Sequence, residues 1–297
     1  MNTMNTVTPN PWILAARPRT LPISIMPVVL GSALAYHSDH FLIVPALVCL
    51  LFALLVQIGA NYANDYYDFI KGADTPERKG PQRAVASGLV EPTAMRNATF
   101  VVLGLAFLLG LALIAYGGWW LIIIGALSVV CAIAYTGGPF PLGYHGLGDL
   151  FVFIFFGLVA VMVTYYVQVG HFTYESFLVG VGYGLMAVNV LVVTSYRDIN
   201  TDRQVGKKTL AVRFGREFAQ VQFSASLYVA LGICFLLWVS TFRFWVLLPL
   251  LLLPYAYYLS NSLITALSTE DFKVLLFNTM RMLVLYGLIL SLGIVLS

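Results

Sequence analysis

Long apolar segments separated by short polar ones dominate the chain. A helix needs roughly 20 mostly apolar residues to cross a bilayer, and nine segments approach or exceed that length. They cover residues 20–36, 41–63, 98–116, 119–136, 147–169, 173–196, 218–240, 244–265 and 275–296. The pattern predicts an all-α polytopic membrane protein: a bundle of nine transmembrane helices, with residues 1–297 forming one integral membrane domain.

Prolines make two of these segments irregular. The first contains Pro22 and Pro27, so its boundaries are the least well defined. Pro249 and Pro254 are expected to kink the eighth segment, because proline removes a hydrogen bond from the helix interior.

The composition supports the membrane interpretation. The chain is 60% hydrophobic and only 10% charged, with a mean hydropathy of +0.88, which excludes an ordinary soluble domain. Its three cysteines are far apart in apolar stretches, so we expect buried thiols rather than a disulfide framework. The four histidines show no zinc-ligand spacing.

Basic residues predict the orientation of the bundle. Three polar segments, which nine crossings place on the same side of the membrane, hold 13 of the 16 Lys and Arg residues. They are Arg17, Arg19, Lys71, Arg78, Lys79, Arg83, Arg96, Arg197, Arg203, Lys207, Lys208, Arg213 and Arg216. Because cytoplasmic loops are enriched in Lys and Arg, the N-terminus and the polar loops 69–97 and 197–217 are predicted to be cytoplasmic, and the C-terminus external.

Each of these two loops is associated with a cluster of acidic and amide side chains. The first cluster contains Asn61, Asn64, Asp65 and Asp68, with Asp74 beyond it, and the second contains Asp198 and Asp202. If the second helix continues through its polar end, the first four residues fall within a sector of about 100°. The two aspartates of the second cluster, four residues apart, also share a helix face.

Carboxylates at this position indicate a metal site. They are costly to place beside a bilayer, and close carboxylates repel each other unless a cation is present. Mg²⁺ binds oxygen ligands and is usually shared with substrate phosphates. The predicted metal ligands are Asn64, Asp65, Asp68, Asp74, Asp198 and Asp202, of which Asp65, Asp68, Asp198 and Asp202 are also predicted to be catalytic.

Basic side chains that follow the acids suit a diphosphate, because Arg and Lys are the usual phosphate ligands. The predicted set is Lys71, Arg78, Arg83, Arg203, Lys207 and Lys208. A different interpretation treats each of them as a topology signal or a lipid headgroup contact. Topology alone, however, does not require repeated Asn and Asp on one helix face.

At these residues the chain resembles the UbiA superfamily of intramembrane aromatic prenyltransferases. The stretch 64–68 is similar to the N-D-x-x-D motif of that family, 198–202 to its D-x-x-x-D motif, and 82–88 to its N-R-P-x-x-S-G stretch. Residues 16–22, 61–88, 135–149 and 197–210 are most similar to the branch that uses 1,4-dihydroxy-2-naphthoate in menaquinone synthesis. The Y-x-x-K motif of the 4-hydroxybenzoate branch is absent after Tyr135.

The resemblance implies a Mg²⁺-dependent transfer of a polyprenyl group from polyprenyl diphosphate to 1,4-dihydroxy-2-naphthoate, with loss of carbon dioxide, giving demethylmenaquinol. It also implies residence in the lipid bilayer of the bacterial cytoplasmic (inner) membrane, with the active site toward the cytoplasm and no nucleic-acid partner. Residues implied to bind the acceptor or stabilise a cation are Asn61, Tyr135, Asp149 and Tyr196. For Asp149, a helix N-cap is the alternative role.

Other functions remain open at this point. A different aromatic acceptor, such as 4-hydroxybenzoate, would use the same motifs. A secondary transporter also uses intramembrane carboxylates, but here the acids lie at the ends of the apolar segments and cations follow them, which favours an enzyme. A lipid-linked phosphotransferase would carry a D-G-x-x-A-R pattern, which this sequence lacks.

Overall fold

The computed structural model describes residues 10–74 and 80–297, which are mostly helical and contain no strand. The elements in chain order are α1 (Pro11–Ala16), η1 (Pro18–Thr20), α2 (Pro22–His37), α3 (Ile43–Ile70), α4 (Pro92–Gly110), η2 (Leu111–Leu113), α5 (Ile114–Gly117), α6 (Leu121–Ala134), η3 (Leu142–His145), α7 (Gly148–Val152), η4 (Phe153–Val159), α8 (Ala160–Val169), α9 (Tyr174–Arg197), α10 (Ile199–Gln204), α11 (Leu210–Thr241), η5 (Phe244–Leu252), α12 (Leu253–Thr265) and α13 (Thr269–Val295). Of these, η4 is a π-helical segment.

The described residues form a bundle of long apolar helices, but the predicted count of nine spans is not confirmed. Seven helices are long and apolar enough to cross a membrane in that part of the chain. An eighth is reached if α1–η1 and α2, which meet at a bend of 48°, form one broken span. The fourth predicted segment forms α6, whose 14 residues rise only about 21 Å, short of a hydrocarbon core of about 30 Å.

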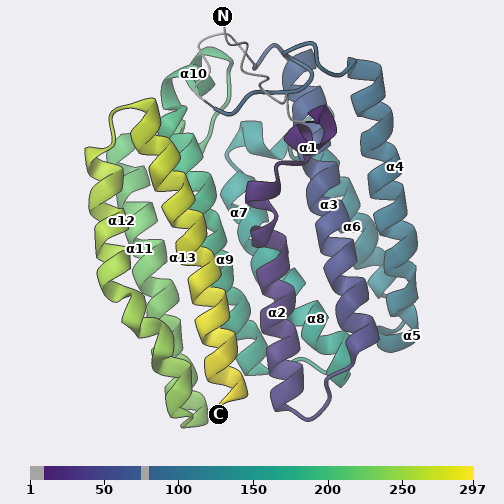
Figure 1. The fold of residues 1–297 in the computed structure, drawn as a ribbon, viewed down its shortest axis with the longest axis vertical. Coiled ribbons are helices and arrows are strands. Elements are labelled where there is room, and N and C mark those ends of the chain that lie inside the picture. The colour runs from purple at the N-terminus through teal and green to yellow at the C-terminus, as the bar shows by residue number, and fades with distance from the viewer. Residues whose placement is uncertain (1–9, 75–79) are drawn as a thin grey trace, which may run out of the picture.

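The helices pack in two groups with others between them (Figure 1). Helices α9, α11, α12 and α13 form one group, α3, α4 and α6 form the other, and α2, α7 and α8 lie between the two. The short helix α10 lies at one end of the bundle, which we call the polar end, and α13 finishes at the opposite end.

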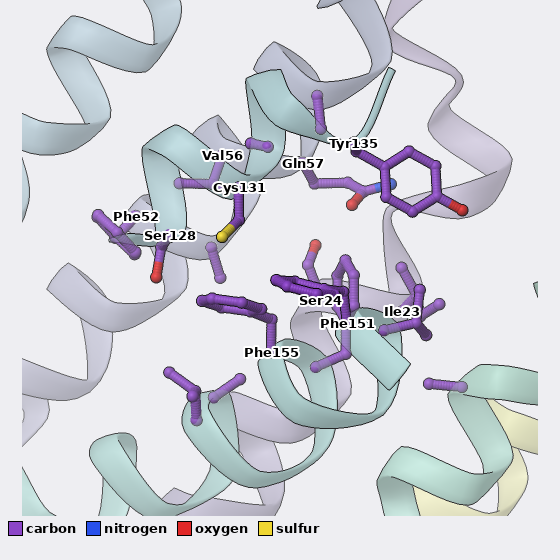
Figure 2. A pocket seen from close by; sticks show the side chains of 18 of the residues that line it. Ile23, Ser24, Phe52, Val56, Gln57, Ser128, Cys131, Tyr135, Phe151 and Phe155 are labelled. Atoms are coloured by element: carbon purple, nitrogen blue, oxygen red, sulfur yellow. The ribbon is translucent and has the colours of Figure 1, made fainter. Parts of the chain in front are cut away.

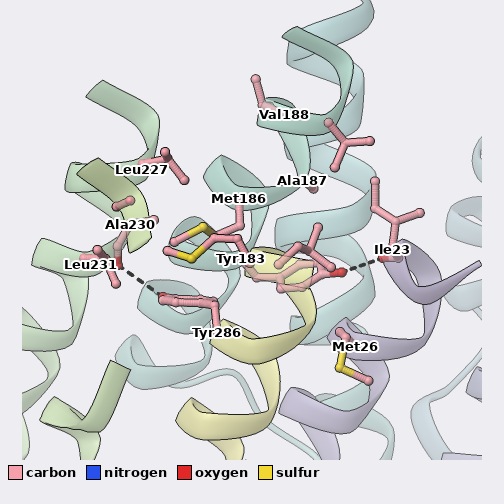
Figure 3. Close-up of a cluster of buried hydrophobic side chains, with 14 of the residues drawn as sticks. Ile23, Met26, Tyr183, Met186, Ala187, Val188, Leu227, Ala230, Leu231 and Tyr286 are labelled. Carbon is pink, nitrogen blue, oxygen red and sulfur yellow. Dashed lines mark hydrogen bonds between the residues drawn. The ribbon is translucent and has the colours of Figure 1, made fainter. Parts of the chain in front are cut away.

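The largest core joins α2 to α9, α11 and α13 (Figure 3). Two buried tyrosines cross it, and each has its hydroxyl satisfied by a backbone carbonyl. Tyr183 donates to Ile23 at 2.8 Å, and Tyr286 donates to Ala230 at 3.2 Å. Since a buried hydroxyl without a partner is costly, these bonds fix α9 against α2 and α13 against α11.

A contact between glycines sets the spacing of η4 and α9. A Cβ atom on Gly157 would lie 2.6 Å from the carbonyl oxygen of Gly180 and 2.6 Å from the Cα of Gly184. Both obstructing atoms belong to the backbone, so the two segments approach this closely only because side chains are absent.

The two predicted polar loops contain more helix than expected. Helix α3 continues to Ile70, and the second loop contains both α10 and the first residues of α11. Helix α11 is itself broken at Gly215, whose φ of 88° is outside the helical region. The acidic clusters are therefore carried by helix ends and a short helix.

Candidate functional site

A cavity of about 320 Å³ runs through the bundle between α2, α3, α6, η4 and α9. Its lining on α3 extends from Cys49 to Asn64, a rise of about 22 Å at 1.5 Å per residue. Figure 2 shows the rings of Phe151 and Phe155 in its wall, with Tyr135 and Gln57 nearby. The cavity is therefore a long, mostly apolar space with polar groups at the motif-bearing end of α3.

Two asparagines of α3 lie where the cavity meets the polar end. Asn61 is buried and donates through Nδ2 to the carbonyl of Ala16 at 2.8 Å. Asn64, one turn later, accepts a hydrogen bond of 2.8 Å from Thr136 Oγ1. Both line the cavity, and their bonds connect α3 to the N-terminal segment and to the loop after α6.

Asp65 points toward the loop that follows the first acidic cluster. Its two carboxylate oxygens accept from the backbone N–H groups of Ala84 and Val85 at 3.1 and 3.0 Å. Asp65 is almost completely buried and is not among the residues lining the cavity. The observed contacts hold the loop against α3, and the predicted metal and catalytic roles of Asp65 stay predictions.

Asp68 is the centre of a group of polar side chains that we call the polar cluster: Asp68, Lys71, Arg83, Tyr144 and Lys207. Arg83 Nη2 lies 3.0 Å from its Oδ2, and Lys207 Nζ lies 3.4 Å from its Oδ1. Tyr144 donates a hydrogen bond of 2.8 Å to the same Oδ1. Because Lys207 follows the second motif, this contact brings the two acidic clusters together across the bundle.

Tyr144 also lies beside two lysines. The ammonium groups of Lys71 and Lys207 each lie 4.7 Å from the centre of its ring, within cation–π range. Burial and the neighbouring charge of Lys207 lower the pKa of Lys71, while Asp68 opposes this effect. Burial and the charge of Asp68 raise the pKa of the Tyr144 hydroxyl, so it remains a hydrogen-bond donor.

The second motif begins in the break between α9 and α10. Asp198 accepts both Nε and Nη2 of Arg197, at 2.8 and 2.6 Å. Asp202, one turn later on α10, makes no side-chain hydrogen bond within the described ranges. Burial raises its pKa to about 6, with further contributions from the charges of Asp198 and Asp68, while Lys207 opposes the shift.

The donor chemistry of these groups fits a divalent cation. No set of three His, Cys, Asp or Glu side chains in residues 10–74 and 80–297 is already arranged as a metal site. Asp202 nevertheless lies close enough to Asp68 and Asp198 to be affected by their charges, and a cation would relieve that repulsion. Mg²⁺ takes few protein ligands and completes its shell with water and substrate phosphates, so Asp68, Asp202 and the Asn64 amide suit it.

The basic residues that were predicted to bind the diphosphate do not share one position. Lys71 donates to the carbonyl of Thr136, and Arg83 Nε lies 3.3 Å from Asp74 Oδ1. Lys208 is exposed and contributes its backbone to a bond with Tyr144, and Arg203 is exposed on α10. Arg78 lies outside the described residues.

The predicted acceptor-binding residues are not all brought together. Asn61 and Tyr135 line the cavity, whereas Asp149 and Tyr196 are not among its lining residues. Asp149 accepts a bond of 2.7 Å from Gln222 on α11. Tyr196 accepts one of 2.9 Å from Gln220, so its hydroxyl is directed toward α11.

Several site residues were not predicted from the sequence. Tyr144 and Thr136 contact the first motif from the loop after α6, and no spacing rule marks either of them. Phe151 and Phe155 line the cavity four residues apart. Their apolar character alone does not distinguish a cavity wall from a lipid-facing surface.

Comparisons with known proteins agree with the resemblance to the UbiA superfamily. The protein family described as the UbiA prenyltransferase family matches residues 24–283. The 1,4-dihydroxy-2-naphthoate octaprenyltransferase of Escherichia coli K12 is 36% identical, over 96% of this chain and 95% of that protein. The Mycobacterium leprae protein of the same name is 42% identical over 75% of each chain.

A solved structure shows the same fold. A UbiA homologue from Archaeoglobus fulgidus bound to DMAPP and Mg²⁺ superimposes with a TM-score of 0.66. The alignment covers 95% of this chain and 99% of that one, with 15% sequence identity.

Proposed function

This chain belongs to the UbiA prenyltransferase family, and we propose that it transfers a polyprenyl group from polyprenyl diphosphate to 1,4-dihydroxy-2-naphthoate. The carboxyl group of the acceptor leaves as carbon dioxide, and the product is demethylmenaquinol, a step of menaquinone biosynthesis. The names of relatives that are 36% and 42% identical support this choice of acceptor.

One observation carries the proposal: the groups around the two acidic motifs lie close together, one helix turn beyond the end of an apolar cavity. Lys207, which follows the second motif, contacts Asp68 of the first. The cavity reaches Asn61 and Asn64 on the same helix. A polyprenyl diphosphate fits this arrangement, because its charged diphosphate suits the polar groups and its long apolar tail suits the cavity.

Asp68, Asp202 and Asn64 would hold Mg²⁺ together with the diphosphate. Bound Mg²⁺ supplies positive charge that stabilises the departing diphosphate. Lys71 and Lys207 lie beside the same tyrosine ring, and their mutual repulsion decreases when an anion binds between or near them. Arg83 adds a guanidinium fork suited to phosphate oxygens.

In the chemical step, negative charge develops on the diphosphate and positive charge on the allylic carbon. The bond between the allylic carbon and the diphosphate oxygen breaks, and its electron pair leaves with the diphosphate. The acceptor ring donates a pair to that carbon, and loss of carbon dioxide leaves the pair of the broken carboxyl bond in the ring. Aromatic faces at Tyr135, Phe151 and Phe155 would stabilise the developing cation, and the apolar lining would limit its capture by water.

We also propose that the polar end faces the cytoplasm of a bacterial inner membrane. The Lys and Arg excess of the segments at that end supports this orientation. In this orientation the N-terminus is cytoplasmic and the C-terminus external, because α1 lies toward the polar end and α13 finishes at the other. Labelling of a single cysteine introduced at exposed Arg203 in inverted and right-side-out vesicles tests it.

The activity is tested with membranes that contain the protein, Mg²⁺ and a polyprenyl diphosphate. We expect prenylated naphthoquinol and carbon dioxide from 1,4-dihydroxy-2-naphthoate, and no product after chelation of Mg²⁺. Product from 4-hydroxybenzoate in its place would overturn the choice of acceptor, and product from neither would overturn the enzyme proposal.

A further inference from the structure

A second cavity, of about 310 Å³, lies at the polar end between α9, α10, α11 and the connection from α12 to α13. It shares no lining residue with the first cavity. Its lining combines polar and apolar residues: Arg197, the exposed Arg216 and Asn200 are cationic or polar, and Ile264 and Leu267 are aliphatic.

The guanidinium of Arg197 has an unused donor group. Its Nε and Nη2 are both engaged by Asp198, whereas Nη1 makes no hydrogen bond with any described residue. Arg197 is itself among the lining residues and is 8% exposed. Its charge is therefore held in place by one carboxylate while part of its fork remains available.

Arg216 supplies the second positive charge. Its guanidinium lies 4.8 Å from the centre of the Tyr196 ring, and the Tyr196 hydroxyl is fixed by Gln220. Within the described ranges Arg216 has no carboxylate within 4 Å. An aromatic support of this kind orients a guanidinium without neutralising it.

The aliphatic lining residues suit a hydrocarbon chain. Leu267 is 85% exposed, and Ile264 is also largely exposed, at the end of two helices that are long and apolar enough to cross a membrane. A cavity lined by two guanidinium groups and by exposed aliphatic side chains matches the headgroup and upper acyl region of an anionic lipid.

We propose that this second cavity binds a phosphate group, held by Arg197 Nη1 and Arg216, with a phospholipid as its membrane source. The site also touches the second acidic motif through Arg197. A phosphate bound at Nη1 would offset part of the positive charge of Arg197, which now faces Asp198 alone. Asp198 would then attract a metal ion more strongly. This coupling rests on the proposed function, whereas phosphate binding does not.

Binding is tested with the purified full-length chain in two arms. One arm compares nanodiscs of phosphatidylcholine with nanodiscs that also contain phosphatidylglycerol, and the other adds inorganic phosphate to protein in neutral detergent. The readouts are the melting temperature and the number of retained lipids by native mass spectrometry. The matched control for Arg216→Gln is Arg96→Gln, which removes the same charge from an exposed position of α4.

We expect phosphatidylglycerol to raise the melting temperature of the wild type and of Arg96→Gln, and the increase to fall by at least half in Arg216→Gln. A shift that depends on Arg216 in inorganic phosphate as well would assign the site to phosphate from either source. If Arg216→Gln responds like the wild type in both arms, the site is wrong. Arg216→Lys, which keeps the charge, should give an intermediate response if Arg216→Gln does not fold.

Two further measurements separate the parts of the proposal. Leu267→Asn should weaken the lipid response and leave the response to inorganic phosphate unchanged; equal loss of both would contradict an apolar contact with the lipid. Phosphatidylglycerol should lower the apparent Kd for Mg²⁺ at least threefold in the wild type and not in Arg216→Gln. Lipid binding without that change would overturn the coupling alone, and absence of prenyl transfer would not affect the lipid arm.

Discussion

The Tyr144 hydroxyl donates a hydrogen bond of 2.8 Å to Asp68 Oδ1, joining a residue of the loop after α6 to the first acidic motif. The same tyrosine ring lies under two lysine ammonium groups. A single aromatic side chain therefore positions one carboxylate and two cations of the polar cluster.

Replacement of Tyr144 by Phe keeps the ring and removes the hydroxyl. Because outer-shell partners of metal ligands are typically worth about 10- to 100-fold in affinity or activity, we expect an activity loss of about 10-fold and a higher Mg²⁺ requirement. Tyr144→Leu also removes the support of Lys71 and Lys207, so its KM for the diphosphate should rise further. Equal KM values in the two variants would contradict the role of the ring.

Asp65 and Asp68 are predicted to fail in different ways when changed to Asn. An Asn at position 65 would place an amide donor against the Ala84 or Val85 N–H, at a cost of about 1–3 kcal/mol for the unsatisfied group. We expect Asp65→Asn to lower the melting temperature, and its folded fraction to respond normally to Mg²⁺. Asp68→Asn removes the charge that faces Arg83 and Lys207, so it should also lower the melting temperature, but its folded fraction should lose Mg²⁺-dependent turnover. Loss of the Mg²⁺ response in folded Asp65→Asn would instead make Asp65 a ligand.

The raised pKa of Asp202 predicts a pH-dependent metal affinity. With a pKa of about 6, the carboxyl is ionised at pH 8 and takes up a proton as the pH falls through 6. Mg²⁺ must then displace that proton, so its Kd should rise by up to about 10-fold per pH unit below 6. Titration of the Mg²⁺-induced shift in melting temperature measures this. Asp202→Asn should show a flatter dependence, and an unchanged profile would exclude Asp202.

The cavity predicts an effect of side-chain size on the prenyl chain that is accepted. Ala53 lines the cavity on α3, and Ala53→Phe would fill part of it. We expect kcat/KM for a long polyprenyl diphosphate to fall at least 10-fold, and that for geranyl diphosphate to fall less than threefold. Leu51→Phe, at a position that is 48% exposed on the same helix, is the control and should change neither. A uniform loss in Ala53→Phe would argue against a chain-binding path.

The glycine contact between η4 and α9 predicts a stability difference. Gly157→Ala places a Cβ 2.6 Å from backbone atoms of α9, and overpacking of this kind costs about 1–3 kcal/mol. Gly104→Ala on α4 meets nothing within 4 Å and should be neutral or slightly stabilising, since Ala is the better helix former. Melting temperatures of the purified variants test the difference, and equal values would show that the backbone adjusts.

The sequence predicted the helical bundle, because apolar length is a local property. The shared face of the first acidic cluster was conditional on a helix that continues through its polar end, and α3 does continue to Ile70. The sequence also placed Asn61, Asn64 and Asp68 on one side of that helix. It did not predict that the carboxylate of Asp65, at the edge of the same sector, accepts hydrogen bonds from the backbone N–H groups of Ala84 and Val85. That contact depends on the path of a loop, which no periodicity describes.

The directions of the Tyr196 and Asp149 side chains could not be predicted from local sequence either. Tyr196 follows the pattern of a motif-flanking aromatic, yet its ring lies under Arg216 and lines the second cavity. Asp149 accepts a hydrogen bond from Gln222, a residue of α11. In both cases neighbours distant in the sequence decide the direction of the side chain.

The shortness of α6 has a consequence for how two unlike substrates can meet. Because this helix stops at Ala134, the chain after it turns inward, and Thr136 and Tyr144 reach α3 at Asn64 and Asp68. A segment that presents hydroxyl groups to α3 thus takes the place of the last turns of a full-length helix. In the proposed reaction, a polar aromatic acid and an apolar chain would meet at the level of Asn64, where these hydroxyl groups lie beside the apolar cavity.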